Sequence, residues 1–326
     1  MQKRLSANEY IKGVLAGDRG ILSRAITLVE SQLDQDKRLA QEVLEKTLPF
    51  SGKAIRIGIT GVPGVGKSTF IEAFGKNITN QNKKIAVLAI DPTSQRTSGS
   101  IMGDKTRMEE LAHESLAYIR PSPAGNSLGG VANKTRETIL LCEAAGFEVI
   151  IVETVGVGQS ETVVKGMVDF FLLLMLSGAG DELQGIKRGI MEMADAVVIT
   201  KSDGDNIQRV KNAQMEYVHA LHLYPATQNN WYPPVLTCSA LEKTGLAEIW
   251  TMITDFFEKM QANGYWKNNR QEQNLAWMYA FIQQSLEMQF FDNQVVKDNI
   301  LSIKEKILAG ELLPIQGANI LLSLRK

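Results

Sequence analysis

A glycine-rich segment from Gly61 to Ser68 holds the first residues whose types and spacing can do chemistry. It reads Gly-Val-Pro-Gly-Val-Gly-Lys-Ser, the G-x-x-x-x-G-K-S pattern of a phosphate-binding loop, and lies between an expected strand and a segment with helical spacing. The glycines let the backbone curl so that successive N–H groups face an anion, and the following helix adds its positive dipole end.

We therefore predict that this loop cradles nucleotide phosphates and that Lys67 reaches the β and γ phosphates as a catalytic residue. The alternative is a glycine-rich turn between a strand and a helix, in which Lys67 is merely solvated. The predicted phosphate-binding residues are Gly61, Val62, Pro63, Gly64, Val65, Gly66, Lys67, Ser68 and Thr69.

Ser68 and three carboxylates have the chemistry of a magnesium site. Asp91 and Glu153 each follow an apolar run that we expect to be a strand, and Asp104 lies between them in the sequence. Because ligands of an open parallel sheet bind at the carboxyl ends of its strands, Asp91 and Glu153 should emerge beside the phosphate loop. Mg²⁺ keeps several waters in its octahedral oxygen shell, so few protein ligands are needed. Taken alone, Asp91 is as easily a helix cap or turn residue, and Asp104 a surface charge. The predicted metal ligands are Ser68, Asp91, Asp104 and Glu153, and Glu153 is also counted as catalytic.

A second polar segment, Thr200-Lys-Ser-Asp203, follows another expected strand and is a version of the guanine-reading N/T-K-x-D sequence. The carboxylate of Asp203 can accept from the N1–H and N2–H₂ donors of guanine, while the stem of Lys201 can lie along the purine face. Adenine lacks these paired donors and would leave the carboxylate unpaired, so discrimination on the order of 10⁴ is within reach. Alone, the segment is a weak signal and more often a solvated strand-to-helix turn, but its position after a complete phosphate loop favours guanine. The predicted base-binding residues are Thr200, Lys201, Asp203, Ser239 and Ala240.

Short apolar runs alternate with longer amphipathic segments from Ala54 onward, whereas the first fifty residues show near-helical apolar spacing. Near-continuous apolarity is typical of strands covered on both faces, so we predict an α/β fold with a mostly parallel sheet flanked by helices. Ser6 and Glu9 have the spacing of a helix capping box. The expected strands are Ile55 to Thr60, Ile85 to Ile90, Val149 to Val152, Phe170 to Leu176, Ala196 to Thr200 and Val235 to Cys238.

Strand signals stop after about residue 263, and patterns over 273–286 and 296–308 are helical. We therefore predict a helical N-terminal extension over residues 1–53, a nucleotide-binding domain over 54–262 and a helical C-terminal arm over 263–326.

The composition narrows the choice of partner and compartment. Among the 326 residues, 35 Lys and Arg balance 36 Asp and Glu, so the chain has no basic field for nucleic acid. The longest strongly apolar run, Phe170 to Leu176, is far short of the roughly 20 residues that cross a bilayer. The two cysteines lack metal-ligand spacing and fit a reducing compartment. We expect a cytoplasmic protein with neither a nucleic-acid nor a membrane partner.

Seven motifs in this order closely resemble the MeaB/ArgK family of metallochaperone-like GTPases, which includes the methylmalonic aciduria type A protein. The resemblance spans nearly the whole chain and is strongest from Ala54 to Trp250. Glu153 is distinctive, because many GTPases have Asp at this place. The motifs are GVPGVGKST, DPTS, GDKTRM, ETVGVGQSE, GAGDELQGIKRG, TKSDGDN and TCSALEKTG.

The resemblance implies a SIMIBI-type P-loop GTPase that uses GTP, GDP and Mg²⁺ and forms a homodimer through its C-terminal arm. It also implies a chaperone that gates adenosylcobalamin loading and protects methylmalonyl-CoA mutase or a related B12-dependent acyl-CoA mutase. The family's magnesium positions fall on the four metal ligands named above, and its guanine-reading positions fall on Thr200, Lys201 and Asp203. Its flexible loop, called switch III, falls on Ser177 to Arg188.

Thr200 departs from the family pattern, in which most members have Asn. An Asn side chain can hydrogen-bond towards the phosphate loop and tie the base and phosphate sites together, whereas Thr offers only a shorter hydroxyl. We hypothesise looser nucleotide binding with an intact preference for guanine, because Asp203 is retained.

The residue that orients the attacking water is not evident. No Gln directly follows Gly156, and Gln159 comes three residues later. We therefore expect slow basal hydrolysis that accelerates when a partner orders a loop and supplies or repositions a cation. Lys187 and Arg188 are the candidate cations, with Lys187 taken as catalytic; the alternative is an ordinary solvated basic pair at a helix start.

Other functions find less support. A nucleotide-dependent kinase of a transport protein, an older label for ArgK-like sequences, should bind ATP and hold a base for its substrate. A structural subunit with a vestigial nucleotide site is a third possibility. A nickel-insertion GTPase usually carries His-rich or Cys-containing sites, whereas His219 and His222 lack such a partner and are expected to be surface or packing residues.

Overall fold

The computed structural model describes residues 4–90, 108–121, 128–154, 160–178, 188–224 and 229–324. The chain divides into two compact units, Met1–Gln273 and Asn274–Lys326.

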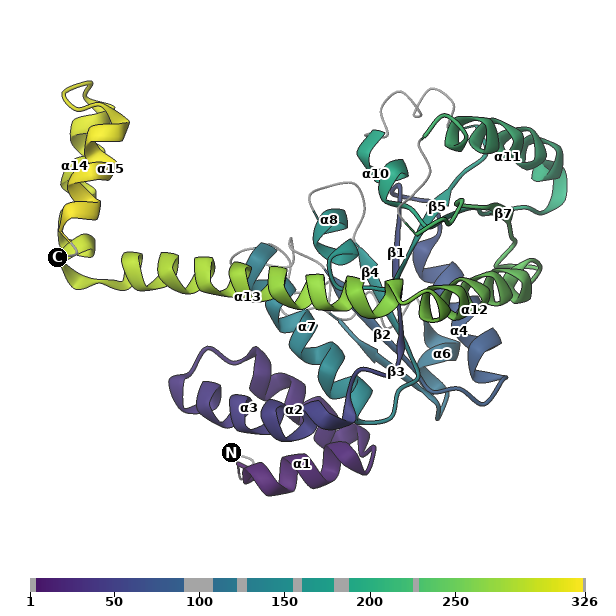
Figure 1. Ribbon diagram of the computed structural model, residues 1–326, viewed down its shortest axis with the longest axis horizontal. Helices are drawn as coiled ribbons and strands as arrows, with labels where there is room; N and C mark the ends of the chain where they lie inside the picture. Colours follow the sequence, from purple (N-terminus) through teal and green to yellow (C-terminus); the bar gives the residue numbers. More distant parts are fainter. Residues whose placement is uncertain are drawn as a thin grey trace. The chain divides into compact units, whose positions relative to one another are not determined.

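A seven-stranded sheet forms the centre of the first unit (Figure 1), in the order β3-β2-β4-β1-β5-β6-β7. All of its strand pairs are parallel, and β1 pairs with β4 on one side and with β5 on the other. The strands are β1 (Ile55–Gly61), β2 (Ile85–Ile90), β3 (Ala117–Arg120), β4 (Val149–Thr154), β5 (Phe170–Met175), β6 (Ala196–Ile199) and β7 (Val235–Thr237).

Helices cover both faces of this sheet, as the apolar runs predict. Along β4, Val149 and Ile151 belong to one buried cluster, whereas Ile150 and Val152 belong to another on the opposite face. The covering helices are α4 (Lys67–Thr79), α6 (Glu109–His113), α7 (Leu128–Ala144), α8 (Ser160–Lys165), α10 (Arg188–Met193), α11 (Ile207–Leu221) and α12 (Leu246–Ala262). The predicted α/β fold with a parallel sheet is confirmed.

The predicted strands agree with the observed ones except at β3. Its sequence, Ala-Tyr-Ile-Arg, has four residues and was not among the expected runs. A strand this short at the edge of the sheet gives too little apolar signal to be recognised by pattern alone.

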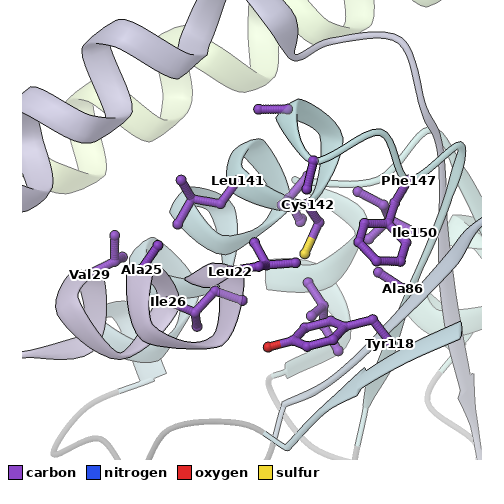
Figure 2. Packing of buried hydrophobic residues seen from close by; sticks show 14 of the residues in the cluster. Leu22, Ala25, Ile26, Val29, Ala86, Tyr118, Leu141, Cys142, Phe147 and Ile150 are labelled. Atoms are coloured by element: carbon purple, nitrogen blue, oxygen red, sulfur yellow. The ribbon is translucent and has the colours of Figure 1, made fainter. Parts of the chain in front are cut away.

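Three N-terminal helices, α1 (Ala7–Leu15), α2 (Arg19–Glu30) and α3 (Asp34–Thr47), pack beside α7. Figure 2 shows Leu22, Ala25, Ile26 and Val29 of α2 packed near Leu141 and Cys142 of α7. The capping box predicted at Ser6 and Glu9 is present at the start of α1. The N-terminal helices thus share one apolar cluster with the sheet.

The chain ends in α13 (Tyr265–Asp292), α14 (Gln294–Leu308) and α15 (Pro314–Ser323). The boundary between the two units lies inside α13, after Gln273, whereas the sequence pattern placed the start of the arm at residue 263. Contacts of the first turns explain the later boundary, because Gln273 Nε2 donates to Val168 O at 2.8 Å. Among the described residues, no helix is both long and apolar enough to cross a membrane.

Candidate nucleotide-binding site

The glycine-rich loop joins β1 directly to α4, as its motif requires. Gly66 precedes α4 with φ of 91°, a left-handed conformation that glycine adopts without strain. At Gly61, a Cβ atom would lie only 2.5 Å from Leu174 O of the neighbouring strand, so this position also needs glycine. The two glycines allow the loop to turn tightly over the carboxyl edge of the sheet.

A cavity of about 540 Å³ opens above this loop. No side chain of a described residue caps the N-terminus of α4, so its first N–H groups point to the cavity with the positive end of the helix dipole. The described residues that line the cavity are Pro63, Gly64, Gly66, Lys67, Ser68, Thr69, Ala89, Ile90, Glu153 and Thr154. Such a lining suits an anion of the size of a polyphosphate.

Lys67 lies folded against the loop that carries it. Its Nζ donates to Gly61 O at 2.9 Å and to Val62 O at 3.4 Å. Burial lowers the pKa of the Lys67 ammonium, while the carboxylates of Glu153 and Glu161 act in the opposite direction. A half-buried cation whose hydrogen bonds within the described residues all go to backbone carbonyls can exchange these acceptors for phosphate oxygens.

Ser68 and Glu153, two of the predicted metal ligands, come together at the carboxyl edge. Ser68 Oγ lies 3.5 Å from Glu153 Oε1, and Glu153 is buried at the end of β4. A hydroxyl and a carboxylate oxygen facing one cavity are hard donors of the kind that Mg²⁺ takes, so these two residues fit this metal. The other predicted ligands, Asp91 and Asp104, lie outside the described residues.

The predicted base-reading segment, residues 200–203, is connected to the phosphate loop by two hydrogen bonds. Thr200 is buried and its hydroxyl donates to Val65 O at 2.8 Å, so the side chain that replaces the family's Asn still reaches the loop. Lys201 has φ of 59° and its Nζ donates to Gly64 O at 3.0 Å. The two ends of the predicted site therefore form one connected structure.

The carboxylate of Asp203 accepts a hydrogen bond from the side chain of Ser239. The Ser239 hydroxyl donates to Asp203 Oδ2 and accepts from Glu242 N at 3.0 Å, and Ser239 is completely buried. The adjacent Ala240 is half-buried. This arrangement fixes one oxygen of the Asp203 carboxylate.

Glu161 and Asn206 belong to motifs noted in the sequence but had no predicted role. Glu161 in α8 is 1% exposed, and its carboxylate interacts electrostatically with Lys67. The two residues are 94 positions apart in the sequence, so no local spacing indicates this interaction. Asn206 Nδ2 donates to Lys201 O at 2.7 Å, and its Oδ1 accepts from Ser177 Oγ at 2.8 Å. Asn206 thus supports the base-reading segment.

The remaining predictions fall on other parts of the chain. Gln159 and Lys187 lie outside the described residues, and so does most of the predicted switch III segment. His219 and His222 are exposed on or beside α11, and the described residues contain no group of three or more His, Cys, Asp or Glu side chains arranged to hold a metal.

A parallel sheet with a glycine-rich loop between its central strand and a helix defines a P-loop nucleotide hydrolase. The model of the family described as "Methylmalonyl Co-A mutase-associated GTPase MeaB" matches residues 22–295. The chain belongs to this family, and it is a GTPase.

Named relatives and a solved structure agree with this assignment. "GTPase ArgK" of Escherichia coli K12 is 46% identical over 305 residues, covering 92% of each chain. "Methylmalonic aciduria type A homolog, mitochondrial" of Mus musculus is 46% identical over 320 residues, covering 95% of this chain and 77% of the relative. A crystal structure described as "LAO/AO transport system kinase" is 38% identical, with a TM-score of 0.77, and covers 99% of this chain and 98% of that chain.

Proposed function

We propose that this GTPase is a chaperone that gates adenosylcobalamin loading and protects methylmalonyl-CoA mutase or a related B12-dependent acyl-CoA mutase. The observation that carries the proposal is a connected nucleotide site in a chain whose mutase-associated family model matches residues 22–295. The name of the mouse relative, which refers to methylmalonic aciduria, supports the same metabolic setting.

In the proposed site, the loop amides and Lys67 hold the triphosphate. Ser68 and Glu153 hold Mg²⁺, which supplies neutralisation of the charge on the β and γ phosphates. Asp91 and Asp104 complete the proposed metal set. Lys67 exchanges its present bonds to Gly61 O and Val62 O for phosphate oxygens. Because phosphoryl transfer needs positioning and charge stabilisation, these residues supply most of the catalysis.

The guanine base is read by Asp203, whose carboxylate accepts from the N1–H and N2–H₂ groups. Ser239 orients this carboxylate, and the N–H of Ala240 meets the base O6. Thr200 and Lys201 connect this end to the phosphate loop, so the position of the base and that of the phosphates are set together. ATP is discriminated against because adenine offers an acceptor where guanine has N1–H.

The proposed mutase raises a slow basal rate by ordering a loop, with Lys187 as the cation. Replacing Lys187 with Ala is expected to reduce the mutase-stimulated rate far more than the basal rate. Equal losses in both rates would remove Lys187 from this role.

We propose that the second unit pairs with another copy of the chain. Its described helices expose apolar side chains at helical spacing along α13, and α14 and α15 add further exposed apolar residues. The α13 residues are Leu275, Met278, Ile282 and Leu286, which are 45–56% exposed. Sedimentation of the full chain tests the homodimer, since a monomer at micromolar concentration would contradict it.

The function is tested by measuring GTP and ATP hydrolysis with and without purified mutase, together with adenosylcobalamin transfer. GTP should be hydrolysed slowly, mutase should accelerate it, and Lys67→Ala should abolish nucleotide-dependent control of transfer. Transfer of the ATP γ-phosphate to a protein would instead support the kinase function. If the Lys67→Ala variant kept the same control of adenosylcobalamin transfer as the wild type, the result would support a purely structural subunit.

A further inference from the structure

A second cavity, of about 320 Å³, lies between α2 and β3 and shares no described lining residue with the nucleotide cavity. Its lining runs along β3, from Arg19, which is hydrogen-bonded to Glu114 O before the strand, to Arg120 and Pro121 at the end of the strand. The described residues that line it are Arg19, Gly20, Ser23, Ala112, Tyr118, Ile119, Arg120 and Pro121.

Two positions of β3 present polar groups to α2. Tyr118 and Arg120 are two residues apart and therefore point to the same face of the sheet. The Tyr118 hydroxyl lies 3.1 Å from Ser23 Oγ, and Figure 2 shows the Tyr118 ring beneath Leu22 and Ile26 with its hydroxyl towards α2. In a hydrogen bond between two hydroxyls, one group donates and the other accepts. The accepting hydroxyl keeps its own hydrogen, which it can donate to a ligand.

Two guanidinium groups supply the charge of this cavity. Arg19 is exposed, and its Nη1 donates to Glu114 O at 3.3 Å, its one hydrogen bond from the side chain to another described residue. Arg120 uses Nε and Nη2 on Glu30, and Nη2 also on Thr27, so Nη1 is left without a partner among the described residues.

Arg19 and Arg120 are the charged residues among the described lining, and the carboxylates of Asp18 and Glu30 lie next to them. None of the described lining residues is acidic, and Glu30 compensates only one of the two arginines. Asp18 is directed to the N–H groups of Gly20 and Ile21, so it caps α2 rather than pairing with Arg19. Guanidinium groups with unused donors are suited to the paired oxygens of phosphates and carboxylates.

We propose that this cavity is a second ligand site, which binds a small molecule carrying a phosphate or carboxylate group. The anionic group pairs with the guanidinium group of Arg19, and a hydroxyl of the Ser23–Tyr118 pair is a neutral donor to the same ligand. Ala112, Ile119 and Pro121 contact a short apolar body. The volume is at the lower end of the roughly 300–1,000 Å³ found for small-molecule sites, which favours a compact metabolite.

The test uses the full chain saturated with GDP and Mg²⁺, so that the phosphate loop is occupied. Methyl phosphate and malonate are titrated separately by calorimetry at physiological salt, and bound GDP is followed in parallel. We expect saturable binding of at least one probe and a loss of about 10-fold or more in affinity for Arg19→Gln. Arg38→Gln removes the same charge from the exposed face of α3 and should leave affinity unchanged.

Two further variants keep the result interpretable. Arg19→Lys retains the charge but loses the guanidinium fork, so its affinity should lie between those of the wild type and Arg19→Gln. Ser23→Ala should weaken binding a few-fold. Tighter binding of methyl phosphate or of malonate decides which anionic group the site prefers.

Three results would overturn the proposal. The first is the absence of saturable binding of either probe below about 10 mM. The second is an equal effect of Arg19→Gln and Arg38→Gln, and the third is release of GDP by the probe, which would place the probe in the phosphate loop. Failure of the chain to bind GDP at all would show in the parallel readout and would count against the proposed nucleotide site instead.

Discussion

The two edges of the central sheet both gather charged residues, but they use them differently. At the amino edge, Arg56 donates to both oxygens of Glu143 at 2.9 Å, and Arg270 donates to both oxygens of Asp169 at 2.6 and 2.8 Å. At the carboxyl edge, Lys67 Nζ donates to two backbone carbonyls of its own loop, and Ser68 Oγ and Glu153 Oε1 lie 3.5 Å apart.

This difference indicates which buried charges stabilise the fold and which can bind a ligand. At the amino edge, the side chains of Glu143 and Asp169 are 1–2% exposed, and Arg270 also donates to Gly52 O and Ala54 O. These charged groups therefore bind protein partners among the described residues. At the carboxyl edge, Lys67, Ser68 and Glu153 line a cavity, so a triphosphate can replace their present contacts.

The largest expected effect is at the amino edge. Arg270→Ala leaves the buried carboxylate of Asp169 without its bidentate partner, and the free energy of unfolding should fall by about 3–5 kcal/mol. Urea unfolding measures this loss, and the GTPase rate per folded molecule should be unchanged. Lys297→Ala, which removes an exposed ion pair with Asp292, is the control and should cost at most about 1 kcal/mol. Similar costs for both variants would contradict the structural role of the amino edge.

Lys67→Ala should reduce activity and leave stability nearly unchanged, the opposite of the result expected for Arg270→Ala. The GTPase rate should fall by about 10²–10³-fold, because a group that stabilises transferred charge is lost. The free energy of unfolding should change little, since in the described part of the chain the Lys67 ammonium donates to carbonyls of its own loop. Lys76→Ala, which removes a half-buried lysine of the same helix that pairs with Glu110, should leave the rate unchanged. A large loss of stability together with activity in Lys67→Ala would erase the distinction between the edges.

Thr200→Val should have the smallest effect of the three. It removes the hydrogen bond to Val65 O, worth about 1 kcal/mol, so the Kd for GDP should rise about 5-fold. Thr47→Val, at a buried threonine in α3, is the control for general destabilisation and should not alter GDP affinity. An unchanged Kd in Thr200→Val would show that the link between the base and phosphate ends does not contribute to binding.

Thr200→Asn tests the hypothesis drawn from the sequence. If Thr200 makes nucleotide binding looser than Asn would, the Thr200→Asn variant should gain affinity for GDP. The existing bond of Thr200 to the loop predicts that any gain is small. Calorimetric titration of both nucleotides, GDP and ADP, separates these outcomes.

The parts of the molecule that the sequence predicts are those encoded by neighbouring residues. The glycine-rich loop is contiguous, and the apolar runs of β1, β2, β4, β5, β6 and β7 mark the fold. The contacts that sequence reasoning missed join residues far apart. Arg56 and Glu143 are separated by 87 positions, and Arg270 and Asp169 by 101, so no spacing rule pairs them.

The candidate site shows the same division. The sequence predicted Thr200, Lys201 and Asp203 as base readers, but not that Lys201 bonds to Gly64 O across 137 positions. It also included Ser239 in the site without indicating that its hydroxyl is directed at Asp203. The second cavity depends on the pairing of α2 with β3, and β3 itself was too short to be recognised.

The central claim is that the carboxyl edge holds a guanine nucleotide whose base is read by Asp203. The most direct measurement is calorimetry of GDP, ADP and xanthosine diphosphate with Mg²⁺ on the wild type and on Asp203→Asn. The wild type should prefer GDP by at least about 10²-fold. The variant should lose this preference and gain affinity for xanthine, whose C2 oxygen accepts from the Asn amide. Equal binding of GDP and ADP by the wild type, or an unchanged preference for GDP in Asp203→Asn, would contradict the account.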